Sequence, residues 1–154
     1  MQSVLSQVEV FQFLPQDALA SLSKLAEKRT FRTGSELMRQ GEPSATIYVI
    51  TRGRVKVERS LPGIPHPVVL TELGRGEMVG EMGVLDGEPS SATVTALETT
   101  EVLEFSAPTL VVTVLHHPET AKALLQMLSR RLRSTDELAV QLLRNGFQSD
   151  WRPG

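Results

Sequence analysis

The sequence predicts a mainly β domain, a closed sandwich or barrel of short strands, with helices flanking it at both ends. Two observations predict this fold class. Glycines recur between short apolar stretches from about residue 30 to 105, whereas apolar residues at helical spacing occupy the regions before and after. Short strands separated by frequent turn signals are typical of closed antiparallel architectures rather than of βαβ units. A chain of 154 residues is long enough for one such domain.

The first helix is expected to begin at Leu14-Pro15 and to end near Lys28, because apolar residues follow helical spacing between them. Strands are expected at 46–50, 54–58, 68–73, 92–96 and 102–105, where apolar and polar residues alternate or β-branched residues gather. Arg52-Gly53 predicts a turn, and residues 60–67, with three prolines and a glycine, predict a loop.

The last third of the chain predicts helices. Thr109–Leu115 is compatible with a strand because of its valines and with a short helix because of its position. Pro118 suits the first turn of a long helix, with Asn145-Gly146 as its C-terminal cap. The expected organisation is therefore one domain over 1–154, with a helical N-terminus at about 1–28, a β-roll at about 30–106 and C-terminal helices at about 107–145.

Composition excludes several classes of protein. A net charge of −2 gives no electrostatic basis for nucleic-acid binding, and no cysteine is present. No apolar run approaches the roughly 20 residues of a membrane span, so we expect a cytoplasmic protein without membrane contact. No catalytic or metal-ligating constellation emerges, and His116-His117 is interpreted as a solvated helix entry. We expect neither an enzyme nor a cofactor.

The stretch from Leu73 to Val94, LGRGEMVGEMGVLDGEPSSATV, is the most specific part of the sequence. It resembles the phosphate-binding cassette of the cyclic-nucleotide-binding domain family, of the type found in the catabolite activator protein and in protein kinase A regulatory subunits. The residues that match the cassette are Gly80, Glu81, Pro89, Ser91, Ala92 and Thr93. The ordered glycines before it and the long helix after it extend the resemblance over nearly the whole chain. The resemblance implies a jelly-roll-like β-roll.

The resemblance also implies a ligand site. Backbone N–H groups of a tight turn and of a short helix at 81–85 would face the phosphate. Glu81 would accept a hydrogen bond from the ribose 2′-hydroxyl, and an apolar wall would hold the base. The expected ligand-binding residues are Val57, Leu70, Leu73, Val79, Gly80, Glu81, Met82, Ser90, Ser91, Ala92 and Thr135. The resemblance implies a cyclic AMP-like nucleotide as the ligand.

Ser90 departs from the family pattern, because this position normally holds the arginine that pairs with the phosphate. A charged contact contributes about 1.5–3 kcal/mol, so its loss implies about 10- to 1,000-fold weaker phosphate binding unless another group compensates. Arg54, Arg59 and Arg75 are conceivable substitutes. We therefore expect weak binding or an altered ligand.

The long C-terminal helix carries a heptad seam, which consists of Leu125, Leu128, Leu132, Thr135, Ala139 and Leu142. A second apolar flank formed by Leu124, Met127 and Leu138 would suffice to pack on the roll, so the seam predicts a parallel homodimer. Arg130, Arg131 and Arg133 are interpreted as a solvated face.

The first functional interpretation is a regulatory sensor in which ligand occupancy is coupled to the dimerising helix. One alternative is a degenerate, non-binding domain that serves protein interaction or dimerisation. Another is the sensor half of a transcription regulator, which would require an attached DNA-binding unit of some 60–70 further residues. Direct nucleic-acid binding by these residues is not expected.

Overall fold

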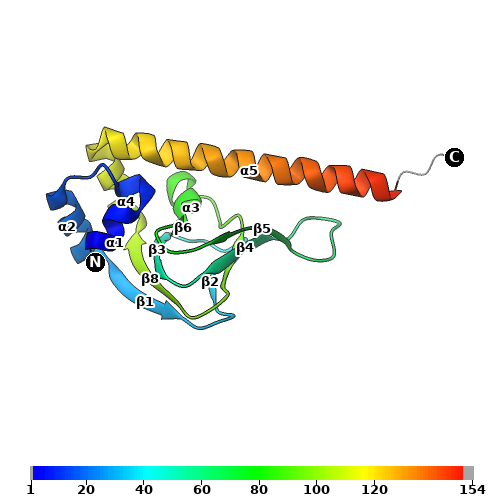
Figure 1. The fold of residues 1–154 in the computed structure, drawn as a ribbon, viewed down its shortest axis with the longest axis horizontal. Helices are drawn as coiled ribbons and strands as arrows, with labels where there is room; N and C mark the ends of the chain where they lie inside the picture. The colour runs from blue at the N-terminus through cyan, green and yellow to red at the C-terminus, as the bar shows by residue number, and fades with distance from the viewer. Residues whose placement is uncertain (1, 151–154) are drawn as a thin grey trace.

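The computed structural model describes residues 2–150, and within them it leaves undescribed the side chains of 2–3, 82, 84–85 and 146–150. Two antiparallel sheets of four strands each form a closed roll (Figure 1). One sheet has the order β1-β8-β3-β6 and the other β2-β7-β4-β5. The strands are β1 Glu27–Phe31, β2 Glu36–Met38, β3 Thr46–Arg52, β4 Val55–Arg59, β5 Val68–Leu73, β6 Met78–Val79, β7 Thr93–Ala96 and β8 Thr100–Ser106.

Helices precede and follow the strands in the sequence, and one short helix, α3, lies between β6 and β7. They are α1 Gln2–Gln7, the 3₁₀ helix η1 Glu9–Phe11, α2 Gln16–Leu25, α3 Glu81–Asp86, α4 Ala107–His116 and α5 Pro118–Asp150. The N-terminal helices and α4 gather at one end of the roll, and α5 runs along its length above α3 (Figure 1). The mainly β fold with an N-terminal helix and a long C-terminal helix is thus confirmed.

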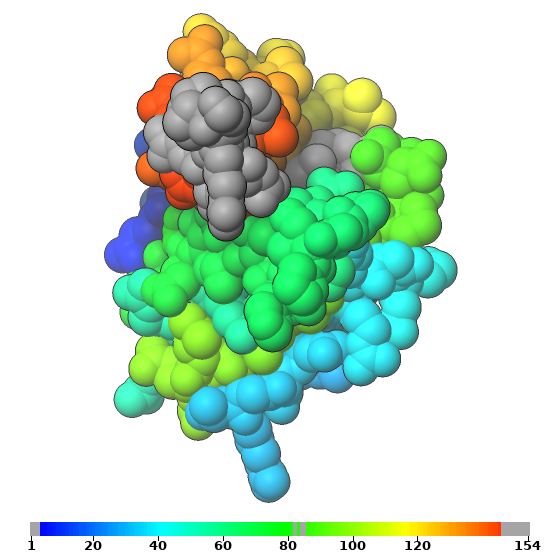
Figure 2. Space-filling view, turned by 90° about the vertical axis from the view of Figure 1, so that its right-hand side faces the viewer, coloured from blue at the N-terminus to red at the C-terminus, as the bar shows by residue number. Residues whose placement is uncertain are grey.

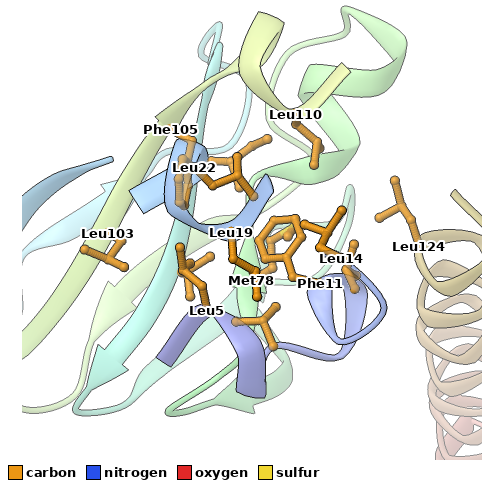
Figure 3. Close-up of a cluster of buried hydrophobic side chains, with 14 of the residues drawn as sticks. Leu5, Phe11, Leu14, Leu19, Leu22, Met78, Leu103, Phe105, Leu110 and Leu124 are labelled. Atoms are coloured by element: carbon orange, nitrogen blue, oxygen red, sulfur yellow. The ribbon is translucent and has the colours of Figure 1, made fainter. Parts of the chain in front are cut away.

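Two apolar clusters form the core. One lies between the two sheets and includes Ile50, Val55 and Val94. In it, the rings of Phe31 and Tyr48 meet edge to face, with 5.8 Å between their centroids. The other joins the helices to the β1-β8-β3-β6 sheet, and Figure 3 shows Leu124 pointing from α5 toward it. We call residues 118–128 of α5 its root. The root is held in place by burial, because Leu124 and Met127 belong to this second cluster.

Two predicted boundaries differ from the structure, and one open assignment is settled. The first helix ends at Leu25, not near Lys28, because the backbone turns extended at Ala26 and Glu27 begins the pairing of β1 with β8. Thr109–Leu115, for which the sequence left strand and short helix open, is helical, within α4. The predicted cap at Asn145-Gly146 is wrong, because α5 continues to Asp150. One glycine costs about 1 kcal/mol in a helix, which is too little to end it by itself.

Beyond its root, α5 forms a ridge above the roll. Figure 2, which looks along the molecule from the C-terminal end of α5, shows this ridge over the green loop between β4 and β5. Its apolar residues there are largely solvent-exposed: Leu132 is 62% exposed and Leu143 is 74% exposed. Within the root, Leu125 is also 68% exposed, on the face turned away from the core. The helix beyond its root is not held by burial in the domain's own core.

Candidate ligand-binding site

Gly80 turns the chain from β6 into α3, and it has a left-handed backbone with φ +95°. A side chain here would place its Cβ only 2.5 Å from the carbonyl oxygen of Thr46 on β3. The preceding residue, Val79, pairs with Tyr48 of the same strand. Both the turn angle and the close approach to β3 require glycine, so the start of the cassette is fixed against the sheet.

Glu81 follows this turn and is only 2% exposed. A carboxylate is rarely buried this fully unless it is paired with a cation. Its Oε1 accepts a hydrogen bond from Nη1 of Arg131, which lies on α5. The other guanidinium nitrogen, Nη2, donates to the carbonyl oxygen of Met78 at 2.7 Å. The cassette and the C-terminal helix are therefore connected by a partly buried ion pair.

The second carboxylate oxygen of Glu81 differs from the first. Oε2 is buried, and no described residue donates a hydrogen bond to it. A buried acceptor without a donor costs about 1–3 kcal/mol relative to a satisfied one. The site therefore holds an acceptor that a hydroxyl or amine donor would satisfy.

Ser90 closes the cassette loop through its own hydrogen bonds. It is 6% exposed, and its hydroxyl donates to the carbonyl oxygen of Ala92 at 2.8 Å. Its N–H donates to the backbone carbonyl oxygen of Glu42 at 2.9 Å, and its own carbonyl oxygen accepts from the N–H of Gly41 at 2.8 Å. Because the hydroxyl is used within the loop, Ser90 in this arrangement ties the cassette to the segment before β3.

The remaining candidate residues occupy different environments. Ser91 is exposed, and Ala92 is buried beside it. On the β4-β5 hairpin, Leu73 belongs to the core between the strands, while Val57 and Leu70 are partly buried. Thr135 is exposed on α5, where its hydroxyl donates to the carbonyl of Arg131 at 3.0 Å. The side chain of Met82 lies outside the described residues.

Arg131 is the residue that sequence reasoning missed. Its interpretation as part of a solvated face is wrong, because its guanidinium contacts Glu81 and Met78. Two of the proposed substitutes for the missing arginine point elsewhere: Arg54 pairs with Glu72 at 2.5 Å, and Arg75 donates to Gln7 at 3.4 Å. The burial of Glu81 is what requires a cation, and the sequence alone did not indicate that burial.

A comparison with known families follows from this geometry. Residues 28–117, more than half of the chain, match the cyclic nucleotide-binding domain family. The chain belongs to this family. The family is regulatory and not catalytic.

Individual relatives agree with this assignment. The cyclic nucleotide-binding domain is 29% identical over 143 residues to a "CRP-like cAMP-activated global transcriptional regulator" of Mycobacterium tuberculosis, covering 93% of this chain and 63% of that protein. Among solved structures, the catabolite activator protein of Thermus thermophilus superposes with a TM-score of 0.75 at 29% identity, over 88% of this chain and 63% of that chain. The N-terminal domain of a Streptomyces coelicolor transcriptional regulator gives 0.68 at 33% identity, over 90% and 95%.

The described residues contain neither a membrane-spanning helix nor a metal cluster. Among them, no helix is both long and apolar enough to cross a membrane. Within the same residues, no group of three or more histidine, aspartate or glutamate side chains is arranged to hold a metal ion. The Gly80–Glu81 turn is the candidate site because it holds the buried Glu81 carboxylate paired with Arg131.

Proposed function

We propose that this domain is a regulatory sensor that binds a cyclic AMP-like nucleotide at the Gly80–Glu81 turn and relays occupancy to α5. The observation that carries the proposal is the buried Oε2 of Glu81, which lacks a donor among the described residues. A ribose 2′-hydroxyl donating to this oxygen would remove the cost of an unsatisfied buried acceptor. Family membership favours a nucleotide over other hydroxyl donors.

The affinity is expected to be weak. Ser90 stands at the position of the family's phosphate-pairing arginine, and its hydroxyl is already bonded to Ala92. A hydroxyl also carries no charge, so it cannot offset that of a phosphate. We therefore expect binding weaker by about 10- to 1,000-fold than a site with that arginine.

Calorimetry tests this function with cyclic AMP, 2′-deoxy cyclic AMP, cyclic GMP and AMP. We expect cyclic AMP to bind and its 2′-deoxy analogue to bind about tenfold more weakly, because the analogue leaves Glu81 Oε2 without a donor. Ser90→Arg should tighten cyclic AMP binding, with circular dichroism confirming its fold. The proposal is wrong if no nucleotide binds the wild type at millimolar concentration, or if the deoxy analogue binds equally well.

Dimerisation is the second part of the proposal. We infer that the heptad seam of α5 pairs with a second copy of this chain, because Leu125 and Leu132 are exposed although an apolar stripe in a monomer would be expected to pack. If nucleotide binding fails and the dimer forms, the domain is a dimerisation module instead. The Mycobacterium tuberculosis relative is described as a transcriptional regulator, and the chain spans 63% of it. On that likeness a role as the sensor part of a regulator is also proposed.

A further inference from the structure

The cassette and the β4-β5 hairpin are connected by a short segment that lies between β2 and β3. Gln40, which begins this segment, donates its backbone N–H to Oγ1 of Thr93 at 3.0 Å, at the end of the cassette. The next two residues exchange backbone hydrogen bonds with Ser90, at 2.8 and 2.9 Å. The backbone of the segment is therefore fixed to the second half of the cassette, which leads into β7.

The side chain of Gln40 reaches the hairpin. Its Oε1 accepts a hydrogen bond from the N–H of Ser60 at 2.7 Å, and its Nε2 donates to the carbonyl oxygen of the same residue at 3.1 Å. The carboxamide thus pairs with both backbone groups of one residue, as a residue of a neighbouring antiparallel strand does. Ser60 is the first residue after β4, so this pairing acts where the hairpin loop begins (Figure 1).

The strand β4 is irregular just before this point. Its pairing with β5 shifts register between Val57 and Glu58, and its pairing with β7 ends at Glu58 and Thr93. A register shift bends a strand and interrupts its ladder of hydrogen bonds, so the strand beyond it is less firmly aligned. Gln40 binds the chain two residues beyond Glu58 and joins it to the cassette.

We propose that Gln40 is a positioning residue of the ligand site, which holds the apolar wall for the base in line with the cassette for the ribose. This inference rests on the proposed function. The expected wall residues Val57 and Leu70 lie on the two strands of the hairpin, and both are partly buried. The inference is carried by the simultaneous contact of Gln40 with Thr93 and with Ser60.

Affinity depends on this alignment because a bound nucleotide contacts the wall and the cassette at once. Without the side-chain contact, the hairpin occupies several positions relative to the cassette, and a fraction of them accept the base. The apparent dissociation constant rises by the inverse of that fraction, so a competent fraction of about one tenth weakens binding about tenfold. A nucleotide with a smaller base buries less apolar area against the wall and loses less affinity.

Calorimetric titration of cyclic AMP and of cyclic CMP tests this role. Gln40→Leu keeps the approximate size of the side chain and removes both of its hydrogen bonds to Ser60. We expect its affinity for cyclic AMP to fall about tenfold, while that for cyclic CMP, with its smaller pyrimidine, falls by less than about threefold. Gln40→Glu retains an acceptor for the N–H of Ser60 but no donor for its carbonyl oxygen. Its affinity for cyclic AMP should therefore lie between those of Gln40→Leu and the wild type.

Arg39→Gln is the matched control. Arg39 is the neighbouring residue, and its guanidinium contacts Glu36 and Glu42 rather than the hairpin. This variant should bind both nucleotides as the wild type does. Circular dichroism confirms that each variant is folded.

The outcomes separate the two proposals. If the wild type binds no nucleotide at millimolar concentration, the proposed function fails, and the role of Gln40 fails with it. If the wild type binds cyclic AMP and Gln40→Leu binds it equally well, or weakens both nucleotides by the same factor, only the role of Gln40 is overturned. Gln40→Glu decides if cyclic CMP binds too weakly to measure or if Gln40→Leu does not fold. An affinity for cyclic AMP equal to that of the wild type then overturns the role of Gln40, and a weaker one supports it.

Discussion

Glu81 and Ser90 illustrate how single side chains set the chemistry of the cassette. One carboxylate oxygen of Glu81 accepts from Arg131, and the other has no donor among the described residues, so it can accept a hydrogen bond from a ligand. Ser90, at the opposite end of the cassette, directs its hydroxyl to Ala92. A substitution at Ser90 therefore changes both the charge of the site and the closure of the loop, which is why its variants need a check of folding.

Tyr48 provides a test at the same scale, because it is the sole tyrosine of the chain and is buried. Burial raises the pKa of Tyr48 above the ordinary 10.0, Glu104 raises it further, and Arg29 lowers it. The neutral phenol is thus favoured in the folded state. Its contribution to stability is complete below the unfolded pKa and is lost as the pH rises through the folded pKa.

We therefore expect the phenolate absorbance of the folded protein to appear above pH 10, and the free energy of unfolding to decline over the same range. Spectrophotometric titration and denaturation at several pH values measure the two effects. Tyr48→Phe should remove the absorbance change and reduce the decline in stability. A folded-state titration at or below the ordinary value would contradict the burial argument.

The strands depend on turns that bring neighbouring elements into close contact. Gly53 joins β3 to β4 with φ +100°, and a Cβ there would lie 2.7 Å from the carbonyl oxygen of Thr99 and 2.8 Å from Cα of Thr100. The buried Thr100 hydroxyl also donates to carbonyl oxygens of Arg54 and Glu98. This turn thus packs directly against the start of β8, and the two sheets are connected there.

Gly53→Ala should destabilise the domain by about 2–5 kcal/mol, the sum of a left-handed backbone penalty and an overpacking cost. Gly34→Ala is the matched comparison, because Gly34 also has a positive φ, +87°, but a Cβ there would have open space around it. It should cost only about 1–2 kcal/mol. Chemical denaturation measures both values, and equal losses in the two variants would show that the contact with Thr99 and Thr100 is unimportant.

In the single chain, α5 keeps several large apolar side chains exposed to solvent. Its root is buried with the helical cluster, and the seam residue Leu128 packs partly against that cluster. The seam residues Leu125 and Leu132 are exposed. An exposed apolar stripe along one helix is typical of a helix that pairs with another. A second copy of the chain, related by two-fold symmetry, would cover the same residues on both partners.

The double substitution Leu125→Glu with Leu132→Glu should halve the mass measured by light scattering while leaving the circular dichroism spectrum unchanged. Both side chains are exposed in the single chain, so the substitution disrupts pairing without disrupting the core. Val112→Glu is a suitable control, because Val112 is an exposed apolar residue on α4. It should retain the dimer mass. A wild type of monomeric mass would refute the dimer.

The sequence predicted those features that depend on local pattern. Alternation and the turn at Arg52-Gly53 located β3 and β4, and the Gly80–Glu81 signature located the turn before α3. The end of α2 was misplaced because the pairing of Glu27 with Glu104 is a tertiary effect. The contact of Arg131 with Glu81 was missed for a similar reason. It joins residues that share no local periodicity, and a charged helix face is usually solvated.

Arg130 and Arg131 have a joint consequence as neighbours on α5. Successive residues of a helix point about 100° apart, so one arginine engages Glu9 of η1 while the next engages Glu81 of the cassette. This turn of α5 therefore contacts both the N-terminal segment, through Glu9, and the cassette, through Glu81. The 19 residues from Arg131 to Asp150 extend the helix by about 28 Å, at 1.5 Å per residue. If α5 rotated by about 10° about this turn, its C-terminal end would move by about 5 Å. A small displacement of the helix beside Glu81 would therefore give a larger displacement at the end of α5.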